Sequence, residues 1–294
     1  MAPTRSPSVS ANFLREMWVL GLVAAVACGL ASCSSHAPSG TPTSSASPGK
    51  RLTWMVTKSA LSQLVTDPTV RSRLEASQVY ELLQPGQEPV ATAGAVPVVT
   101  FAAVGDLQQA VTGNQLPAGT RAVLYDPEAW SFTPAAEQQN PAQAAQQAAG
   151  LAHAHGLKLI VAPALNLTTV QSGSTGPRWK QFLNLGLAGA MAKVADVIEL
   201  QAQSLEQQTG TYADFVRAAA AQARAANPKV TVLAGLSTNP PGAPVSSQQL
   251  TAAVSATSAM VDGYWLNIPG QGARCPSCNA PRPDIGRQTL RAVS

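Results

Sequence analysis

The sequence has few charged, aromatic, histidine and cysteine residues. Asp, Glu, Lys and Arg make up 12% of the 294 residues and Phe, Trp and Tyr 5%, whereas 45% of the residues are hydrophobic. Charged residues usually make up about 25% of a soluble domain, so this is not a highly charged disordered chain, and its apolar content is ample for a core. The net charge is +4, with none of the clustering of Lys and Arg that is typical of nucleic-acid binders. We therefore expect no nucleic-acid partner, and we expect a monomer.

The four cysteines and three histidines leave little material for a metal centre. Two of the cysteines lie near the N-terminus, so only Cys275 and Cys278 belong to the rest of the chain. A structural zinc site needs four ligands, and His153 and His155 are two positions apart on an expected helix, so they face different directions. No P-loop, dinucleotide-binding glycine motif or serine nucleophile elbow is present. We predict no metal and no cofactor, and a disulfide between Cys275 and Cys278 in an oxidising compartment.

The N-terminus has the pattern of an export signal. Arg5 and Arg15 precede a segment without charge that runs from Met17 to Ser32. A basic region followed by a short apolar region is typical of a signal peptide. The apolar segment is shorter than the roughly 18 residues expected of a transmembrane helix, which favours export over a membrane span.

The uncharged segment ends in Leu30-Ala31-Ser32-Cys33, which resembles the lipobox of bacterial lipoproteins. The resemblance implies that residues 1–32 are removed and that the Cys33 thiol is acylated, anchoring the protein to the outer side of the cell membrane. Two or more acyl chains anchor a protein stably, because each buried CH₂ contributes about 0.8 kcal/mol. Residues 33–50 are mostly Ser, Pro, Thr, Gly and Ala and are expected to form a flexible tether. The alternatives are an uncleaved anchor and a chance cysteine in the signal of a secreted protein.

Residues 51–294 alternate between strand-like and helix-like segments. The expected strands are 52–57, 79–83, 96–103, 122–126, 158–164, 197–203, 230–237 and 262–268, and the expected helices are 59–76, 106–112, 141–155, 179–194, 212–226, 246–259 and 285–293. Strands that alternate with helices predict βα units and a parallel sheet. The length suits a (β/α)₈ barrel, which usually needs about 250 residues. We predict one such barrel domain, with an open doubly wound parallel sheet as the alternative.

The segment 197–203 favours the barrel. Its alternation places Glu199, Gln201 and Gln203 on one face and apolar side chains on the other. A central strand of an open parallel sheet is usually apolar on both faces, whereas functional groups are expected at the carboxyl ends of barrel strands.

Acidic, amide and indole side chains follow several expected strands. The candidate catalytic residues are Glu128, Asp126 and Glu199, and the candidate substrate-binding residues are Trp130, Gln201, Gln203, Asn239, Trp265 and Asn267. Carboxyl groups supply the acid and base of glycoside hydrolysis, amides bond hydroxyl groups, and indole faces pack on sugar rings. This combination indicates a carbohydrate site, with a polysaccharide or cell-wall ligand.

The segment Asp126-Pro127-Glu128 resembles the Asp-x-Glu that ends the fourth strand of the barrel in chitinase-like glycoside hydrolases. The resemblance implies that Glu128 protonates the leaving oxygen and that Asp126 assists the acetamido group of the substrate. The longer family motif has further acidic residues upstream, where this chain has Ala122 and Leu124.

Alternatives remain open for these residues. Glu199 could be the partner of Glu128, or it could belong to an internal network without a catalytic role. Trp54 and Trp265 could be core residues. The whole domain could bind a glycan or envelope component without turning it over.

Overall fold

The computed structural model describes residues 51–90, 92, 94–171, 175–240 and 244–293. They belong to a compact unit, Pro48–Ser294. The expected signal peptide, the tether and the acylation site Cys33 lie outside the described residues. No helix among the described residues is long and apolar enough to cross a membrane.

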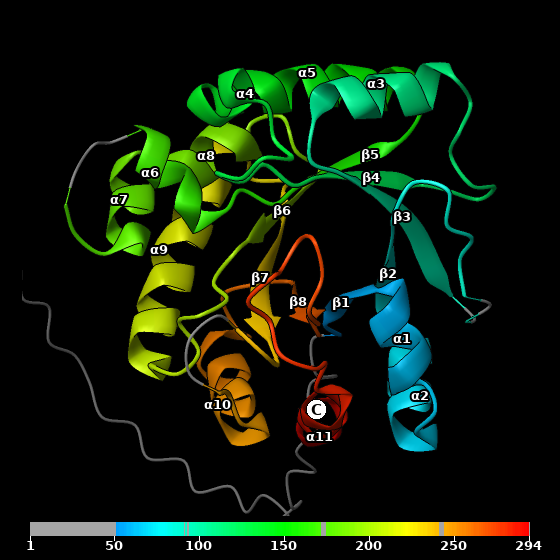
Figure 1. Ribbon diagram of the computed structural model, residues 1–294. Helices are drawn as coiled ribbons and strands as arrows, with labels where there is room; N and C mark the ends of the chain where they lie inside the picture. The colour runs from blue at the N-terminus through cyan, green and yellow to red at the C-terminus, as the bar shows by residue number, and fades with distance from the viewer. Residues whose placement is uncertain (1–50, 91, 93, 172–174, 241–243, 294) are drawn as a thin grey trace, which may run out of the picture. The chain divides into compact units, whose positions relative to one another are not determined.

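The described residues form eight parallel strands that close into a barrel, so the predicted fold is confirmed and the open sheet is excluded. The strands are β1 Thr53–Thr57, β2 Gln78–Leu83, β3 Ala95–Phe101, β4 Ala122–Tyr125, β5 Lys158–Val161, β6 Val197–Leu200, β7 Thr231–Ser237 and β8 Gly263–Asn267. Each strand pairs with the next one in sequence, and β8 pairs with β1 (Figure 1).

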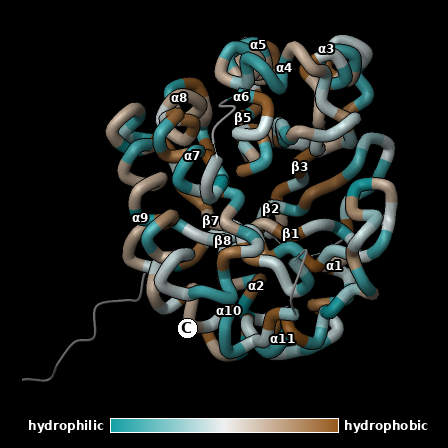
Figure 2. Tube along the Cα trace, turned by 60° about the vertical axis from the view of Figure 1, so that its left-hand side comes forward, coloured by the Kyte–Doolittle hydropathy of each residue, from teal (hydrophilic) through white to brown (hydrophobic). Residues whose placement is uncertain are grey.

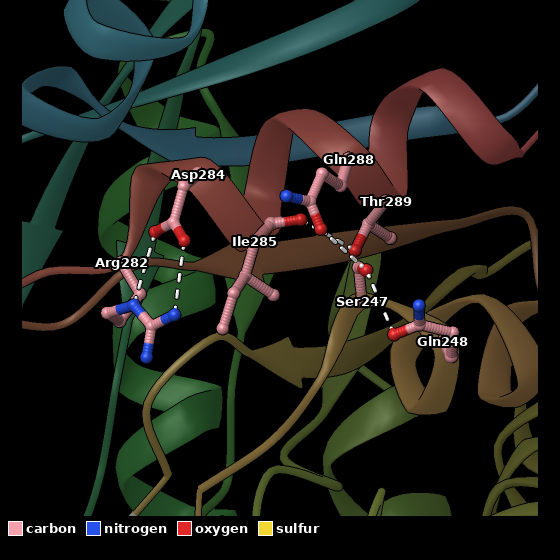
Figure 3. A network of polar contacts seen from close by, with 7 residues as sticks. All are labelled: Ser247, Gln248, Arg282, Asp284, Ile285, Gln288 and Thr289. Atoms are coloured by element: carbon pink, nitrogen blue, oxygen red, sulfur yellow. Dashed lines mark hydrogen bonds and ion pairs between the residues drawn. The ribbon is translucent and has the colours of Figure 1, made fainter.

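The helices surround the barrel. They are α1 Lys58–Leu64, α2 Pro68–Glu75, α3 Val104–Thr112, α4 Ala135–Gln139, α5 Pro141–Ala154, α6 Thr168–Gln171, α7 Arg178–Asn184, α8 Leu187–Ala192, α9 Thr209–Ala226, α10 Ser247–Thr257 and α11 Pro283–Ala292, with a 3₁₀ turn at Leu165–Leu167. Figure 1 shows α11 between α10 and the α1–α2 pair, all of which it contacts. The hydroxyl group of Ser247 on α10 donates to the Gln288 side chain on α11 at 2.9 Å (Figure 3).

Two expected helices are each divided in two. The break in 59–76 falls at Asp67, whose carboxylate accepts the backbone N–H groups of Thr69 and Val70 and so caps the start of α2. Pro68 occupies the first position of α2, where a proline is tolerated because its missing N–H would have had no partner. The break in 179–194 falls at Gly186, which has a φ of 64° in the left-handed region that glycine adopts without strain.

The alternation of the strands creates two cores. Side chains of one parity fill the barrel interior, including Met55, Leu124 and Ile160. Those of the other parity pack under the helices, where α5 contributes small alanine side chains and α9 adds Tyr212, Phe215 and Val216 to its alanines. In Figure 2 hydrophobic colouring follows the strands and alternates with hydrophilic colouring along the helices. The polar side chains that point into the barrel near the carboxyl ends of the strands therefore lie next to this interior core, toward the open end of the barrel.

Gly263 permits the closure of the barrel. It lies opposite Thr53 in the pairing of β8 with β1. A Cβ atom at this position would lie 1.9 Å from the Thr53 carbonyl oxygen, so no other residue type fits without separating the two strands.

Candidate functional site

A cavity of about 640 Å³ opens at the carboxyl ends of the strands. It lies between the ends of β1 to β4, the end of β8 and the loop from β8 to α11. Its polar and aromatic lining comprises Thr57, Lys58, Ser59, Ser62, Gln84, Gln87, Thr100, Asp126, Glu128, Trp130, Trp265, Asn267 and Arg274. Five of the residues that the sequence singled out therefore line one cavity: Asp126, Glu128, Trp130, Trp265 and Asn267.

Asp126 continues the pairing of β4, because its backbone N–H donates to the Phe101 carbonyl oxygen at 2.9 Å. Its side chain is buried. The Nε2 group of Gln201, which follows β6, donates to Asp126 Oδ1 at 2.7 Å and to the Ala162 carbonyl oxygen at 2.8 Å. Gln201 thus fixes the Asp126 carboxyl group relative to the two neighbouring strands β5 and β6.

Glu128 lies two residues further on and is half-buried. Asn166 holds this segment in two ways: its Nδ2 donates to Glu128 Oε2 at 3.2 Å, and its Oδ1 accepts the Ala129 backbone N–H at 2.8 Å. The Thr133 hydroxyl oxygen accepts the backbone N–H of Glu128 at 3.2 Å and the indole N–H of Trp130 at 2.9 Å. The loop after β4 is therefore held by its own Thr133 and by Asn166 of the 3₁₀ turn after β5, and it places a carboxyl group and an indole at the cavity.

Burial controls the protonation of the two carboxyl groups. Loss of solvent raises the pKa of Asp126 well above its ordinary value, and the nearby Glu128 charge raises it further. Burial also raises the pKa of Glu128. The Arg274 cation and the amide donors Gln201 and Asn166 act in the opposite direction on their respective carboxyl groups. The pair therefore retains a proton at a higher pH than two solvated carboxyl groups would.

Glu199 lies fully buried on β6 and does not line the cavity. Within the described structure neither of its carboxyl oxygens has a hydrogen-bond partner. Burial, followed by the charges of Asp126 and Glu128, raises the pKa of Glu199 well above its ordinary value. A carboxyl group in this setting is stable only when it is protonated.

Three of the predicted substrate-binding amides, Gln201, Gln203 and Asn239, do not line the cavity. Gln201 binds Asp126 and the end of β5, as described above. Gln203 packs against β7, where a Cβ atom on Gly235 would lie 2.4 Å from its amide. Asn239 donates to the Asn279 carbonyl oxygen of the β8–α11 loop at 3.3 Å. Trp54, the possible core residue, packs on Tyr264 with ring centroids 5.7 Å apart.

Two polar groups at the cavity have no partner among the described residues. Thr100 and Trp265 are 4% and 7% exposed, both line the cavity, and the Thr100 hydroxyl and Trp265 indole N–H make no hydrogen bond. Buried polar groups are normally hydrogen-bonded. Both atoms are themselves shielded from solvent, so they are unsatisfied buried groups beside the cavity rather than exposed donors.

The structure adds residues that the sequence did not single out. The Arg274 guanidinium group lies over the rings of Trp130 and Phe132, at 5.5 and 5.6 Å from their centroids. Lys58, the residue directly after β1, also lines the cavity; its position at a strand end was the available sequence signal. Arg274 had no such signal, because it lies in a long loop rich in Pro and Gly.

A disulfide joins Cys275 and Cys278 in the same loop. Cys275 also pairs with Gly272 through two backbone hydrogen bonds, of 3.0 and 3.2 Å. The loop segment directly after Arg274 is therefore constrained. The described residues contain no group of three or more His, Cys, Asp or Glu that could hold a metal ion.

Glu206, in the loop between β6 and α9, is a further buried carboxyl group. Its Oε1 accepts the Ser237 backbone N–H at 2.7 Å, which ties this loop to the end of β7. Burial raises the pKa of Glu206 to about 7, against the hydrogen bonds that it accepts. Glu206 does not line the cavity.

No protein-family model and no curated protein matches the chain. Several solved structures are similar. Chitinase from Chromobacterium violaceum is 11% identical with a TM-score of 0.49, covering 83% of this chain and 100% of that one. The catalytic domain of a family GH18 chitinase from the fern Peteris ryukyuensis is 12% identical with a TM-score of 0.48, covering 82% and 99%. Triosephosphate isomerase from Bartonella henselae is 10% identical with a TM-score of 0.46, covering 74% and 92%.

Proposed function

We propose that the barrel is a glycoside hydrolase acting on a polysaccharide, with Glu128 and Asp126 as its catalytic pair. The observation that carries this proposal is the presence of two carboxyl groups from one strand end in a single cavity. Two indoles border the same cavity. Glycoside hydrolysis needs two carboxyl groups in different protonation states, one to protonate the leaving oxygen and one to stabilise positive charge or act on the sugar.

Burial raises the pKa of both carboxyl groups, and that of Asp126 the more strongly. Two neighbouring carboxyl groups with raised pKa values share a proton, so that one is an acid while the other is a carboxylate. We assign the acid to Glu128 on access rather than on pKa, because Glu128 is the less buried of the two and only its Oε2 is held, by Asn166. Asp126, which accepts the 2.7 Å hydrogen bond from Gln201, is then the carboxylate that faces the developing positive charge on the sugar ring.

The remaining cavity residues would hold the sugar. The indole faces of Trp130 and Trp265 offer apolar surface for the C–H face of a ring. The Asn267 amide would bond sugar hydroxyl groups. Glu199 is buried beneath Asp126 and Glu128 and would be protonated. It would therefore add no third negative charge to the site, and it would not touch the substrate.

Non-catalytic recognition of a glycan is the second candidate. It is favoured by the hydrogen bonds that Asp126 and Glu128 accept from amides of the protein itself, because such contacts also stabilise carboxyl groups without any catalytic role. A hydrolysis assay separates the two candidates.

We also propose that the protein is exported and anchored to the outer side of the cell membrane through acylated Cys33. The support is the lipobox-like Leu30-Ala31-Ser32-Cys33 and the basic and apolar segments before it. The disulfide between Cys275 and Cys278 is of the kind that persists outside the cytoplasm.

The test is a glycan array followed by an assay of reducing ends released from every glycan that binds. The wild type is compared with Glu128→Gln, and Glu75→Gln on the exposed part of α2 serves as the matched control. The proposal expects release by the wild type and the control, and binding without release by Glu128→Gln. Binding with no release by any of the three proteins would refute hydrolysis and leave the non-catalytic reading.

A further inference from the structure

The cavity contains two cations that the proposed chemistry does not use. Lys58 comes from the start of α1 and Arg274 from the β8–α11 loop, and both line the cavity. Neither makes an ion pair with a carboxylate of the described residues. The Lys58 charge acts on the buried Glu81 without a direct contact and lowers the pKa of that carboxyl group. Glu81 Oε1 accepts the Val90 backbone N–H at 2.7 Å.

Arg274 is oriented by aromatic rings and leaves its donors free. Its guanidinium group lies over both Trp130 and Phe132, within 5.6 Å of each ring centroid. No hydrogen bond from this guanidinium to another described residue is present. A guanidinium group stacked on rings still presents its in-plane N–H groups, which match the two oxygens of a carboxylate.

Arg274 lies at the solvent-exposed opening of the cavity, whereas Asp126 is buried. An anionic group bound to Arg274 therefore stays at the opening, although the Arg274 charge also acts on Asp126 and Glu128. The proton that the pair retains reduces its repulsion of such a group. A neutral glycan would give neither cation an ion-pair partner.

We propose that the substrate is an acidic polysaccharide, whose sugars carry carboxylate groups that bind Arg274 and Lys58. This inference rests on the proposed function, because it names the class of glycan that the same cavity takes. Arg274 binds the carboxylate through paired N–H groups, and Lys58 provides a second point charge for a neighbouring sugar.

The test uses three polyuronates of different linkage: polygalacturonate, alginate and hyaluronan. Each is paired with the same polymer after its carboxyl groups have been reduced to alcohols. The wild type should bind at least one acidic polymer about tenfold or more tightly than its reduced form, since hydrogen bonds to charged groups are the stronger ones. This preference should weaken as the salt concentration rises.

Three variants locate the preference. Arg274→Gln should lose most of it, Arg274→Lys should retain part of it, and Lys58→Gln should reduce it. The control Arg121→Gln removes an exposed cation just before β4, at the other end of the barrel, and should leave the preference unchanged. Equal binding of acidic and reduced polymers, binding of none of the acidic polymers, or a preference untouched in Arg274→Gln would each overturn the inference.

The outcomes also separate this inference from the proposed function. Arg274-dependent binding of an acidic polymer without release of reducing ends would uphold the inference and refute hydrolysis. Release of reducing ends from neutral polymers, unchanged in Arg274→Gln, would uphold hydrolysis and refute the inference.

Discussion

At the scale of single residues, the barrel contains carboxyl groups whose environments separate their roles. Asp126 and Glu128 share the cavity, Glu199 is buried without a partner among the described residues, and Glu206 is buried but accepts backbone N–H groups. A buried carboxyl group whose pKa is raised lowers the stability of the folded state as the pH rises, because the unfolded chain releases the proton first.

Glu206 provides a direct measurement of this effect. Its pKa in the folded protein is about 7, against an ordinary value of 4.5, so the unfolded state binds fewer protons between these two values. The stability of the wild type should therefore fall by about 3 kcal/mol from this group as the pH rises through that range, at 1.36 kcal/mol per pKa unit. Glu206→Gln keeps an oxygen that can accept the Ser237 N–H, and it does not titrate.

The measurement is urea-induced unfolding of both proteins at several pH values from 4.5 to 7.5. The other buried carboxyl groups titrate in both proteins and cancel in the difference. The difference in unfolding free energy between variant and wild type should grow with pH in favour of Glu206→Gln. A difference that stays constant over this range would show that Glu206 titrates normally.

Glu128 is a single residue whose substitution should change activity rather than stability. Under the proposed function, Glu128→Gln removes the proton donor and should lower kcat by about 10²- to 10⁴-fold, the usual contribution of a general acid. Substrate affinity should be little changed, because the amide has the same shape. The wild-type rate should decline on the alkaline side at a higher pH than a solvated glutamic acid would allow, because burial raises the pKa of Glu128.

The check is a set of kcat and KM values over a range of pH. A glycan whose leaving group departs without protonation should be cleaved by Glu128→Gln at close to the wild-type rate. If such a substrate is not rescued, Glu128 is not the acid.

At the scale of elements, the barrel depends on how closely β8 approaches β1. Gly263→Ala places a Cβ atom 1.9 Å from the Thr53 carbonyl oxygen, so the strands must separate and the pairing that closes the barrel is weakened. We expect a loss of about 3 kcal/mol or more, comparable to the large effects of overpacking in cores.

Gly150→Ala is the matched control. Gly150 lies exposed on α5, and an added Cβ atom would have nothing within 4 Å. Alanine should stabilise this helix by roughly 0.5–1 kcal/mol, since glycine is the poorer helix former. Thermal or urea unfolding of both variants tests the pair, and a Gly263→Ala protein as stable as the wild type would contradict the closure argument.

The β8–α11 loop is the other element that matters for the site. It contributes Arg274 and Cys275 to the cavity and accepts the Asn239 side chain at Asn279. Its conformation is constrained by the disulfide, by the Gly272–Cys275 pairing and by the stacking of Arg274 on Trp130 and Phe132. The loop therefore couples the last βα unit to the loop after β4 on the far side of the cavity opening.

At the scale of the whole molecule, the proposed anchor is tested independently of the barrel. Metabolic labelling with a radioactive fatty acid should mark the wild type and spare Cys33→Ala, because the Cys33 thiol is the proposed acyl acceptor. Cys28→Ala, which changes a cysteine inside the expected signal peptide, should be labelled like the wild type. Equal labelling of the wild type and Cys33→Ala would refute the anchor.

The sequence by itself determined that residues 51–294 alternate between strands and helices, which left the barrel and the open parallel sheet as the two candidates. The period of two in the strands and the alternation with helices depend on local backbone geometry, and both are readable without a structure. The same local reasoning identified Asp126, Glu128, Trp130, Trp265 and Asn267 as residues at strand ends, and all five line the cavity. The catalytic roles given to them stay predictions.

Only the tertiary structure decided which of the polar residues meet and what surrounds them. Gln203 and Asn239 have the same sequence signal as Asn267, yet their amides contact the protein rather than line the cavity. Arg274 reaches the cavity because its loop folds back across the opening onto Trp130, a contact between distant parts of the chain. The physical reason is that the face of a strand on which a side chain lies is set by the backbone geometry of neighbouring residues. Burial, charge pairing and loop position depend instead on how all eight described strands close into the barrel.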